Sequence, residues 1–204
     1  SNLAEMLKAV KAADRFMEVW GLALDDDIAG VEATGSIDTS GTATEAGTLA
    51  LYIAGHQVKV AVASGDTGDA VATALAAAIT ADTTLPVTAA VNGTTTTQVD
   101  LTARHAGEVG NDIDVRANYY GEKTPAGITV AITDLSGGTS NPDINTAIAG
   151  FGQEWWNWIV NPWNDTANLT ALATELDTRW GPMVQQGARA FTATSGPGIS
   201  LMSE

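Results

Sequence analysis

Two histidines and several aspartates are the residues of this chain that could carry acid–base chemistry. His105 follows a predicted strand, and Asp112 and Asp114 come a few residues later, so a hydrolase using His105 with one of these aspartates is one interpretation. His56 lies in a predicted turn. The sequence has no Gly-x-Ser-x-Gly elbow and no His-x-x-x-His pair. We therefore expect no catalytic residue.

An acidic run, Asp25, Asp26 and Asp27 with Glu32 nearby, could bind a divalent cation through its carboxylates. It lacks the alternating Asp-x-Asp-x-Asp-Gly layout that wraps one ion, so a solvated loop is the favoured interpretation. The glycine-rich stretches lack the Lys-Ser/Thr ending of a phosphate loop and the dinucleotide fingerprint. The sequence predicts no metal site and no cofactor.

Four tryptophans, Trp155, Trp156, Trp158 and Trp163, fall within nine residues. On a strand, Trp156 and Trp158 would share one face. Such a cluster can pack in a core, anchor a subunit interface or stack on a ligand. All three interpretations stay open at this point.

Composition excludes several classes of function. The chain has 204 residues, a formal net charge of -15 and no cysteine. Nucleic-acid binding depends on cationic contacts to phosphate, so we expect no nucleic-acid partner. No apolar run reaches the roughly 20 residues that span a bilayer, so we expect no membrane insertion. The start, Ser1-Asn2, and a loop-like end predict a fragment of a longer protein.

Hydrophobic periodicity divides the chain into an outer part and an inserted part. Helix and strand patterns alternate outside residues 31–136, which is typical of a doubly wound, mostly parallel sheet covered by helices. In this outer part, the patterns predict helices at 3–15, 142–149 and 167–180, and strands at 16–24, 155–160 and 187–194. Inside it, they predict strands at 31–39, 48–53, 57–62, 85–91, 98–103, 113–119 and 128–134, and a helix at about 67–81.

The predicted fold class is therefore α/β, or α+β overall. A discontinuous α/β core domain, residues 3–30 and 137–204, would be interrupted by an inserted β-rich subdomain, residues 31–136. Such an insertion is thermodynamically mild, because the cost of closing a loop grows only logarithmically with its length.

Five segments in order resemble the tail sheath proteins of Mu-like contractile phages. The segments are LDDDIAGVEATGSI (24–37), GTLALYIAGHQVKVAVASGDTGDAVATALAAAI (47–79), LTARHAGEVGNDIDVRANYYGE (101–122), TPAGITVAITDLSGGTSNPDI (124–144) and NPWNDTANLTAL (161–172). No single motif is diagnostic, but the ordered set is fairly specific.

The resemblance implies a structural protein of the virion tail, assembled in the host bacterial cytoplasm. Its subunits would form hexameric rings and a helical polymer around the tail tube, then contract on a signal from the baseplate. The expected partners are other copies, the tail tube protein and the baseplate. Relative to that family, the chain is expected to lack an N-terminal region and the C-terminal domain that carries strand-adding arms.

The residues alone also suit a non-enzymatic building block, since an open helical assembly needs two different contact patches per subunit. We expect the core domain to make the ring contacts and residues 31–136 to project outward. The alternative function, from a different class, is a secreted carbohydrate-binding or adhesin module, which the threonine-rich strands and the tryptophans would suit.

Overall fold

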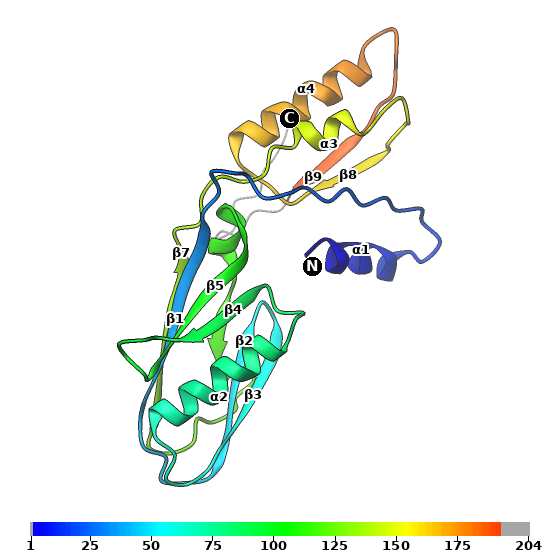
Figure 1. Ribbon diagram of the computed structural model, residues 1–204. Helices are drawn as coiled ribbons and strands as arrows, with labels where there is room; N and C mark the ends of the chain where they lie inside the picture. The colour runs from blue at the N-terminus through cyan, green and yellow to red at the C-terminus, as the bar shows by residue number, and fades with distance from the viewer. Residues whose placement is uncertain (1, 193–204) are drawn as a thin grey trace. The chain divides into compact units, whose positions relative to one another are not determined.

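Figure 1 shows the computed structural model of the chain, in which residues 2–192 are described. Backbone contacts divide the chain into two compact units. The first comprises Ser1–Gly21 and Ile28–Ser140. The second comprises Leu22–Asp27 and the chain from Asn141 onward.

The first unit is built on two antiparallel sheets and one long helix. The four-stranded sheet has the order β4-β5-β1-β7, and the three-stranded sheet has the order β3-β2-β6. The strands are β1 (Glu32–Gly41), β2 (Gly47–Ile53), β3 (His56–Val62), β4 (Val87–Val91), β5 (Gln98–Ala106), β6 (Val115–Ala117) and β7 (Ile128–Ser136), with a 3₁₀ turn η1 (Glu108–Asp112). All seven strands predicted between residues 31 and 136 are present.

The hairpin of β2 and β3 shows why local sequence fixes this part of the fold. Ala54 and Gly55 have φ angles of 49° and 80°. Two positive φ values are what a two-residue turn requires to match the right-handed twist of its strands. The register runs from Gly47 opposite Val62 to Ile53 opposite His56, so the predicted hairpin is confirmed.

Helix α2 (Gly68–Ala81) seals the core of the first unit. Thr67 caps it, since its Oγ1 accepts a hydrogen bond from the Ala70 N–H at 3.5 Å. Gly68 allows the helix to begin against β1, because a Cβ there would lie 1.9 Å from the Thr39 carbonyl oxygen. The core joins buried side chains of both sheets and of α2, among them Ile37, Leu49, Leu51, Leu75, Ile79 and Leu101.

The second unit is smaller and mixed. It contains α3 (Asn145–Ala149), β8 (Trp158–Asn161), α4 (Thr166–Trp180) and β9 (Arg189–Thr192). Strands β8 and β9 form a two-stranded parallel sheet. The buried core of the second unit consists of Ile144, Ala147 and Leu172, with Leu24 and Ile159 among the partly buried residues packed against it.

The predicted fold class is wrong. The sheets of the first unit are antiparallel, and β8–β9 is the single parallel pair that the described residues form. Residues 16–24 form no strand, and Phe16 and Trp20 are 91% and 70% exposed. The alternation of predicted helices and strands favoured a parallel sheet, but an apolar run does not by itself specify which strand it pairs with. The backbone hydrogen bonds of the first unit form antiparallel sheets instead.

Helix α1 (Asn2–Ala13) lies where the sequence predicts a helix. In the part of the chain that the structure describes, neither this helix nor any other has the length and hydropathy of a membrane span.

Candidate functional sites

The four tryptophans of the second unit fall into two groups. Trp155 and Trp158 are 59% and 58% exposed. Trp156 and Trp163 are half-buried, and the Trp156 indole N–H donates to the Phe151 carbonyl at 3.1 Å. The strand begins at Trp158, later than predicted, because residues before it follow an irregular path. In this chain, half of the cluster packs and half faces outward.

Trp158 belongs to an exposed apolar face on the β8–β9 sheet. Its ring stacks on Phe191 of β9, with a centroid distance of 5.4 Å and an interplanar angle of 24°. Val160 is 54% exposed and pairs with Phe191 in the register of the two strands. We call Trp158, Val160 and Phe191 the β8–β9 apolar face. Exposed aromatic residues of this kind are typical anchors of protein interfaces.

Arg179, near the end of α4, fastens three segments of the second unit and is 8% exposed. Its Nε donates to Glu175 at 2.7 Å. Its terminal nitrogens donate to the carbonyls of Gly152 at 2.9 Å and Glu154 at 2.8 Å, and to Gln186 Oε1 at 3.3 Å. Because all three guanidinium nitrogens already donate to acceptors within the unit, we interpret the small hollow that Arg179 lines with Glu175 and Gln186 as structural.

A second polar junction joins the starts of α3 and α4. The side chain of Asn168, which is 4% exposed, accepts from the Ile144 N–H at 2.9 Å and donates to the Pro142 carbonyl at 3.0 Å. Asp165 caps α4 by accepting from the Asn168 N–H at 3.0 Å and also accepts from the Asn141 amide at 2.9 Å. Burial raises the pKa of Asp165, but these hydrogen bonds outweigh it and leave the pKa below its usual value.

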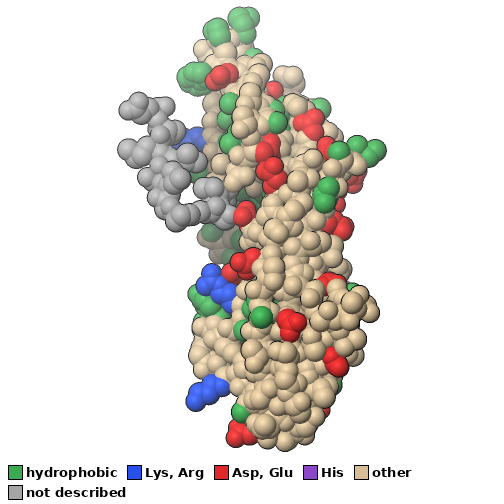
Figure 2. Space-filling model, turned by 90° about the vertical axis from the view of Figure 1, so that its left-hand side faces the viewer, with side chains coloured by type: hydrophobic (Ala, Val, Ile, Leu, Met, Phe, Trp, Pro, Cys, Tyr) green, Lys and Arg blue, Asp and Glu red, His purple; other side chains and the backbone are tan. Residues whose placement is uncertain are grey.

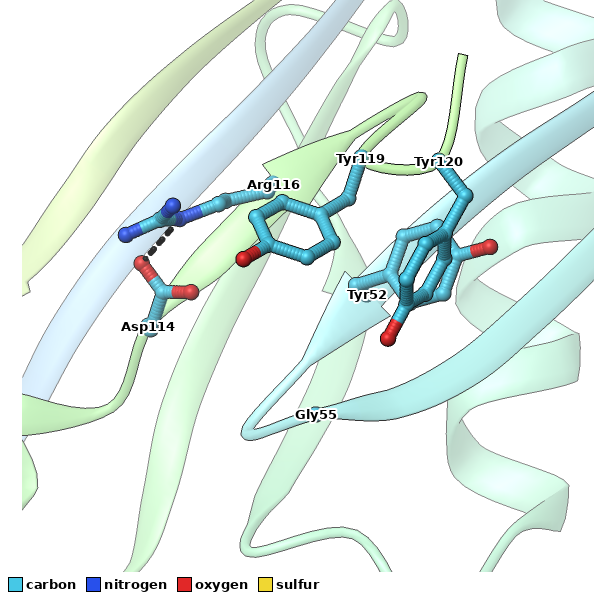
Figure 3. Close-up of a pocket in the computed structure, with 6 residues that line it drawn as sticks. All are labelled: Tyr52, Gly55, Asp114, Arg116, Tyr119 and Tyr120. Carbon is cyan, nitrogen blue, oxygen red and sulfur yellow. Dashed lines mark hydrogen bonds and ion pairs between the residues drawn. The ribbon is translucent and has the colours of Figure 1, made fainter. Parts of the chain in front are cut away.

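A hollow in the first unit brings three tyrosines beside an ion pair (Figure 3). It has a volume of about 210 Å³ and is lined by Tyr52, Gly55, Asp114, Arg116, Tyr119 and Tyr120. We call it the tyrosine pocket. The sequence analysis missed it, although the turn signature Asn-Tyr-Tyr-Gly at residues 118–121 was a signal that could have shown two exposed rings at one turn.

Charged and aromatic contacts hold the tyrosine pocket in shape. Arg116 Nε donates to Asp114 Oδ1 at 2.8 Å, and the guanidinium carbon lies 5.2 Å from the centroid of the Tyr119 ring. That hydrogen bond, with the charge of Asp114, raises the pKa of Arg116. The Tyr119 and Tyr120 rings meet edge to face, with centroids 5.0 Å apart.

Hydrogen bonds from polar side chains hold the third ring, Tyr52, in place through its hydroxyl group. Its hydroxyl donates to Glu122 and accepts from the side-chain amide of Gln57. Burial raises the pKa of Tyr52, and the hydrogen bond to Glu122 raises it further. The same hydrogen bond lowers the pKa of Glu122. The three groups keep the base of the pocket in one arrangement.

The residues that the sequence singled out for acid–base or metal chemistry are not gathered into a site. His56 begins β3 and His105 lies on β5, both exposed. Asp114 lines the tyrosine pocket, whose lining includes no histidine. Across residues 2–192, no group of three His, Asp or Glu side chains is placed to hold a metal ion, aspartates 25–27 included. Figure 2 shows acidic side chains scattered over one face rather than clustered.

Comparison with known proteins gives two matches. A family model described as the phage tail sheath protein beta-sandwich domain matches residues 29–143. The chain is also 49% identical over 197 residues to a protein of Haemophilus influenzae (strain ATCC 51907 / DSM 11121 / KW20 / Rd) named Mu-like prophage FluMu tail sheath protein. That alignment covers 96% of this chain and 40% of the relative, so the chain spans about two fifths of the length of the protein it matches.

Proposed function

This chain belongs to the phage tail sheath family, and on that premise we propose that it is part of a structural subunit of the contractile tail sheath of a Mu-like phage or prophage. The full-length subunit polymerises around the tail tube and contracts to drive the tube through the host envelope. The observation that carries the proposal is the 49% identity, which extends over 96% of the chain. The role is structural and non-catalytic.

We propose the same division of labour within the chain that the sequence suggests. Residues 31–136 form an inserted subdomain, and residues 3–30 and 137–204 belong to the core domain of the subunit. Two observations support this. The contact-based division has boundaries near residues 28 and 140, although it groups the residues up to Gly21 with the β-rich unit, and the family model matches 29–143. In addition, the insert begins and ends side by side, since the Val31 and Thr139 backbones exchange hydrogen bonds of 3.0 and 3.2 Å.

The partners follow from this role. Copies of the subunit assemble into hexameric rings and a helical polymer inside the host bacterial cytoplasm, and the product is part of the virion tail. The tail tube protein and the baseplate are the other partners. Contraction requires contacts between copies with two discrete arrangements, because packed interfaces switch between states rather than deform continuously. The insert projects outward, and contacts within rings are made by the core domain.

We assign the exposed tryptophans to contacts between copies. Trp155 and Trp158 are largely exposed, and Trp158 lies on the β8–β9 apolar face. The Trp158 ring already stacks on Phe191, so it loses little conformational freedom on binding, which suits an interface anchor. Trp156 and Trp163 serve the packing of the second unit instead. Ligand stacking is not needed to explain any of the four.

The test is assembly of the full-length protein, followed by negative-stain microscopy and light scattering at low and high salt. We expect cylinders, and we expect them most readily at high salt, which screens the repulsion between chains of net charge -15. A full-length protein that stays a small discrete species at high salt contradicts the proposal. Deleting residues 31–136 should leave association between copies intact, and weakened association contradicts the outward placement of the insert.

The interface assignment has its own matched pair of variants. Trp158→Ser in the full-length protein should shorten or abolish the cylinders. Trp180→Ser changes another exposed tryptophan of the same unit, 68% exposed, that lies outside the β8–β9 apolar face, and should leave cylinders unchanged. Equal effects of the two variants contradict the assignment.

A further inference from the structure

The tyrosine pocket is presented by a turn whose backbone is unusual. Asn118 has a φ of 55° and Gly121 a φ of 86°. Neighbouring side chains of an extended chain point to opposite sides, yet the Tyr119 and Tyr120 rings touch on one side. The turn is held by hydrogen bonds from the Asn118 N–H to Ala50 and from the Gly121 N–H to Asn118, at 3.0 and 3.1 Å. Asn and Gly adopt positive φ most readily, so this turn holds the two rings in place without backbone strain.

The Tyr119 and Tyr120 rings are exposed, whereas the Tyr52 ring is buried beneath them. Tyr119 is 55% and Tyr120 76% exposed, whereas Tyr52 is 6% exposed. The Tyr52 ring contacts both, with centroids 6.0 and 5.2 Å away. Tyr119 and Tyr120 therefore pack on the buried Tyr52 ring on one side and are accessible to solvent on the other. A rigid tyrosine surface gives contact area at a low cost in conformational entropy.

The ion pair beside the rings supplies both kinds of hydrogen-bonding group. A guanidinium carries five N–H donors, and Arg116 uses its Nε for Asp114. The carboxylate of Asp114 has acceptor capacity beyond that bond. Both side chains are 54% exposed. Figure 3 shows Arg116, Tyr119 and Tyr120 in one row along this surface, with the pair at one end and the rings at the other.

The size and charge of the pocket narrow the ligand class. Drug-sized ligands occupy pockets of about 300–1,000 Å³, so a hollow of about 210 Å³ fits one ring rather than a large ligand. The net charge of -15 works against phosphates and other anions. A neutral pyranose has an apolar face of C–H groups and an edge of hydroxyls. It needs an aromatic surface with donors and acceptors at its margin, and the tyrosine pocket has both.

We propose that the tyrosine pocket binds one pyranose ring of a neutral saccharide, with its C–H face on the exposed ring of Tyr120, its edge against Tyr119, and its hydroxyls bonded to Arg116 and Asp114. The inference does not rest on the proposed sheath function. It is argued from the contacts and exposure of residues of the first unit, whereas the sheath proposal is carried by the sequence identity along the whole chain. A free sugar and a terminal sugar of a bacterial surface glycan share this chemistry.

Binding is measured by saturation-transfer NMR, with the 204-residue chain and the methyl glycosides of glucose, galactose, mannose and N-acetylglucosamine. Binding of the same protein to an array of immobilised neutral bacterial polysaccharides is then measured. We expect transfer to at least one glycoside, strongest at protons of the C–H face. Binding to the polysaccharide in addition assigns the ligand to a surface glycan, and binding to the free glycoside alone assigns it to a soluble sugar. Both results support the pocket.

Two variants locate the binding. Tyr120→Ala removes a largely exposed ring, and we expect binding about tenfold weaker, the scale of one aromatic contact. Gly55→Asn adds a side chain at a lining residue, where a Cβ meets nothing within 4 Å and Asn tolerates the φ of 80°, and we expect it to weaken binding. Trp20→Ala, at a ring 70% exposed outside the pocket, is the control and should bind like the parent chain.

Three results overturn the inference. The first is that none of the four glycosides and no neutral polysaccharide binds. The second is that binding is unchanged in both Tyr120→Ala and Gly55→Asn while circular dichroism shows them folded. The third is binding restricted to sialylated or sulfated probes, since it would require an anion site instead of a neutral one.

Discussion

Each of the two units of this chain is stabilised internally by a different kind of contact. In the first, two antiparallel sheets and α2 share one continuous core of fully buried aliphatic side chains. In the second, the buried apolar core is Ile144, Ala147 and Leu172, and the hydrogen bonds of Arg179 and Asn168 do much of the joining. Apolar burial is non-directional, whereas hydrogen bonds to buried groups are costly to leave unmade.

From this contrast we expect the two units to be sensitive to different substitutions. The first unit should tolerate loss of any one surface hydrogen bond but not loss of core volume. The second should tolerate little change at its polar junctions, and its exposed apolar face suggests that its stability depends on further protein surface. The predictions below test that contrast, with effects read separately by hydrogen exchange at amides of β2 and β5 and at amides of α4.

The largest effect is expected from removing core volume in the first unit. Leu75→Ala, at a fully buried position on α2, should lower the free energy of unfolding of this unit by about 4 kcal/mol through lost burial and a cavity. The same change in the second unit, Leu172→Ala at 3% exposure, should cost about 2 kcal/mol, because its small core lies near solvent. Equal losses of unfolding free energy in the two variants would contradict the proposed difference between the two cores.

Arg179→Met should lower the free energy of unfolding of the second unit by about 3 kcal/mol. It leaves Glu175 and two carbonyls without a donor, although Met keeps the apolar stem. Arg189→Met, at an exposed arginine on β9, is the matched control and should change stability by under about 0.5 kcal/mol. If the two variants unfold alike in denaturant, Arg179 does not fasten the unit.

Asn168→Ala should cost the second unit about 2 kcal/mol, since it removes the partners of the Ile144 N–H and the Pro142 carbonyl. Asn164→Ala, an exposed neighbour, should be close to neutral. Loss of protection should appear first at the starts of α3 and α4. Protection that falls equally across β2 would mean that the two units unfold together.

The smallest effect concerns pH. The pKa of Asp165 is lower in the folded chain than in the unfolded chain, so the ionised carboxylate contributes stability above the unfolded value of about 3.9. That contribution is lost as pH falls through the lower, folded pKa. Asp165→Asn keeps the helix cap but cannot titrate, so its second unit should lose less stability between pH 5 and pH 2 than the parent. Parallel pH profiles of the two chains contradict this assignment.

The sequence could predict the elements of the first unit because their signals are local. The apolar run of β2, the alternation along β3 and the Ala54–Gly55 turn specify a hairpin without reference to distant residues. Thr67 and the apolar spacing of Val71, Leu75 and Ile79 specify α2 in the same way. Which strands pair across the sheets, such as β1 with β7, is decided by contacts far apart in sequence.

The parts that could not be predicted depend on such distant contacts. Residues 16–24 have the composition of a buried strand, but composition does not supply a hydrogen-bonding partner. The tryptophans could be found from sequence, yet their division into packed and exposed pairs depends on the path of the chain before β8. The tyrosine pocket joins residues 52 and 55 to residues 114–120, which only the pairing of β2 with β6 brings together.

The backbone bridge between Val31 and Thr139 also has a mechanical consequence. Tension applied between residues 30 and 140 acts at the end of the antiparallel β1–β7 pair, so it breaks the backbone hydrogen bonds sequentially rather than all at once. While the Val31–Thr139 bridge holds, the two ends of this segment stay about one strand spacing apart, so the residues between them carry no load. The bridge is therefore the point at which force would begin to open the β1–β7 pair.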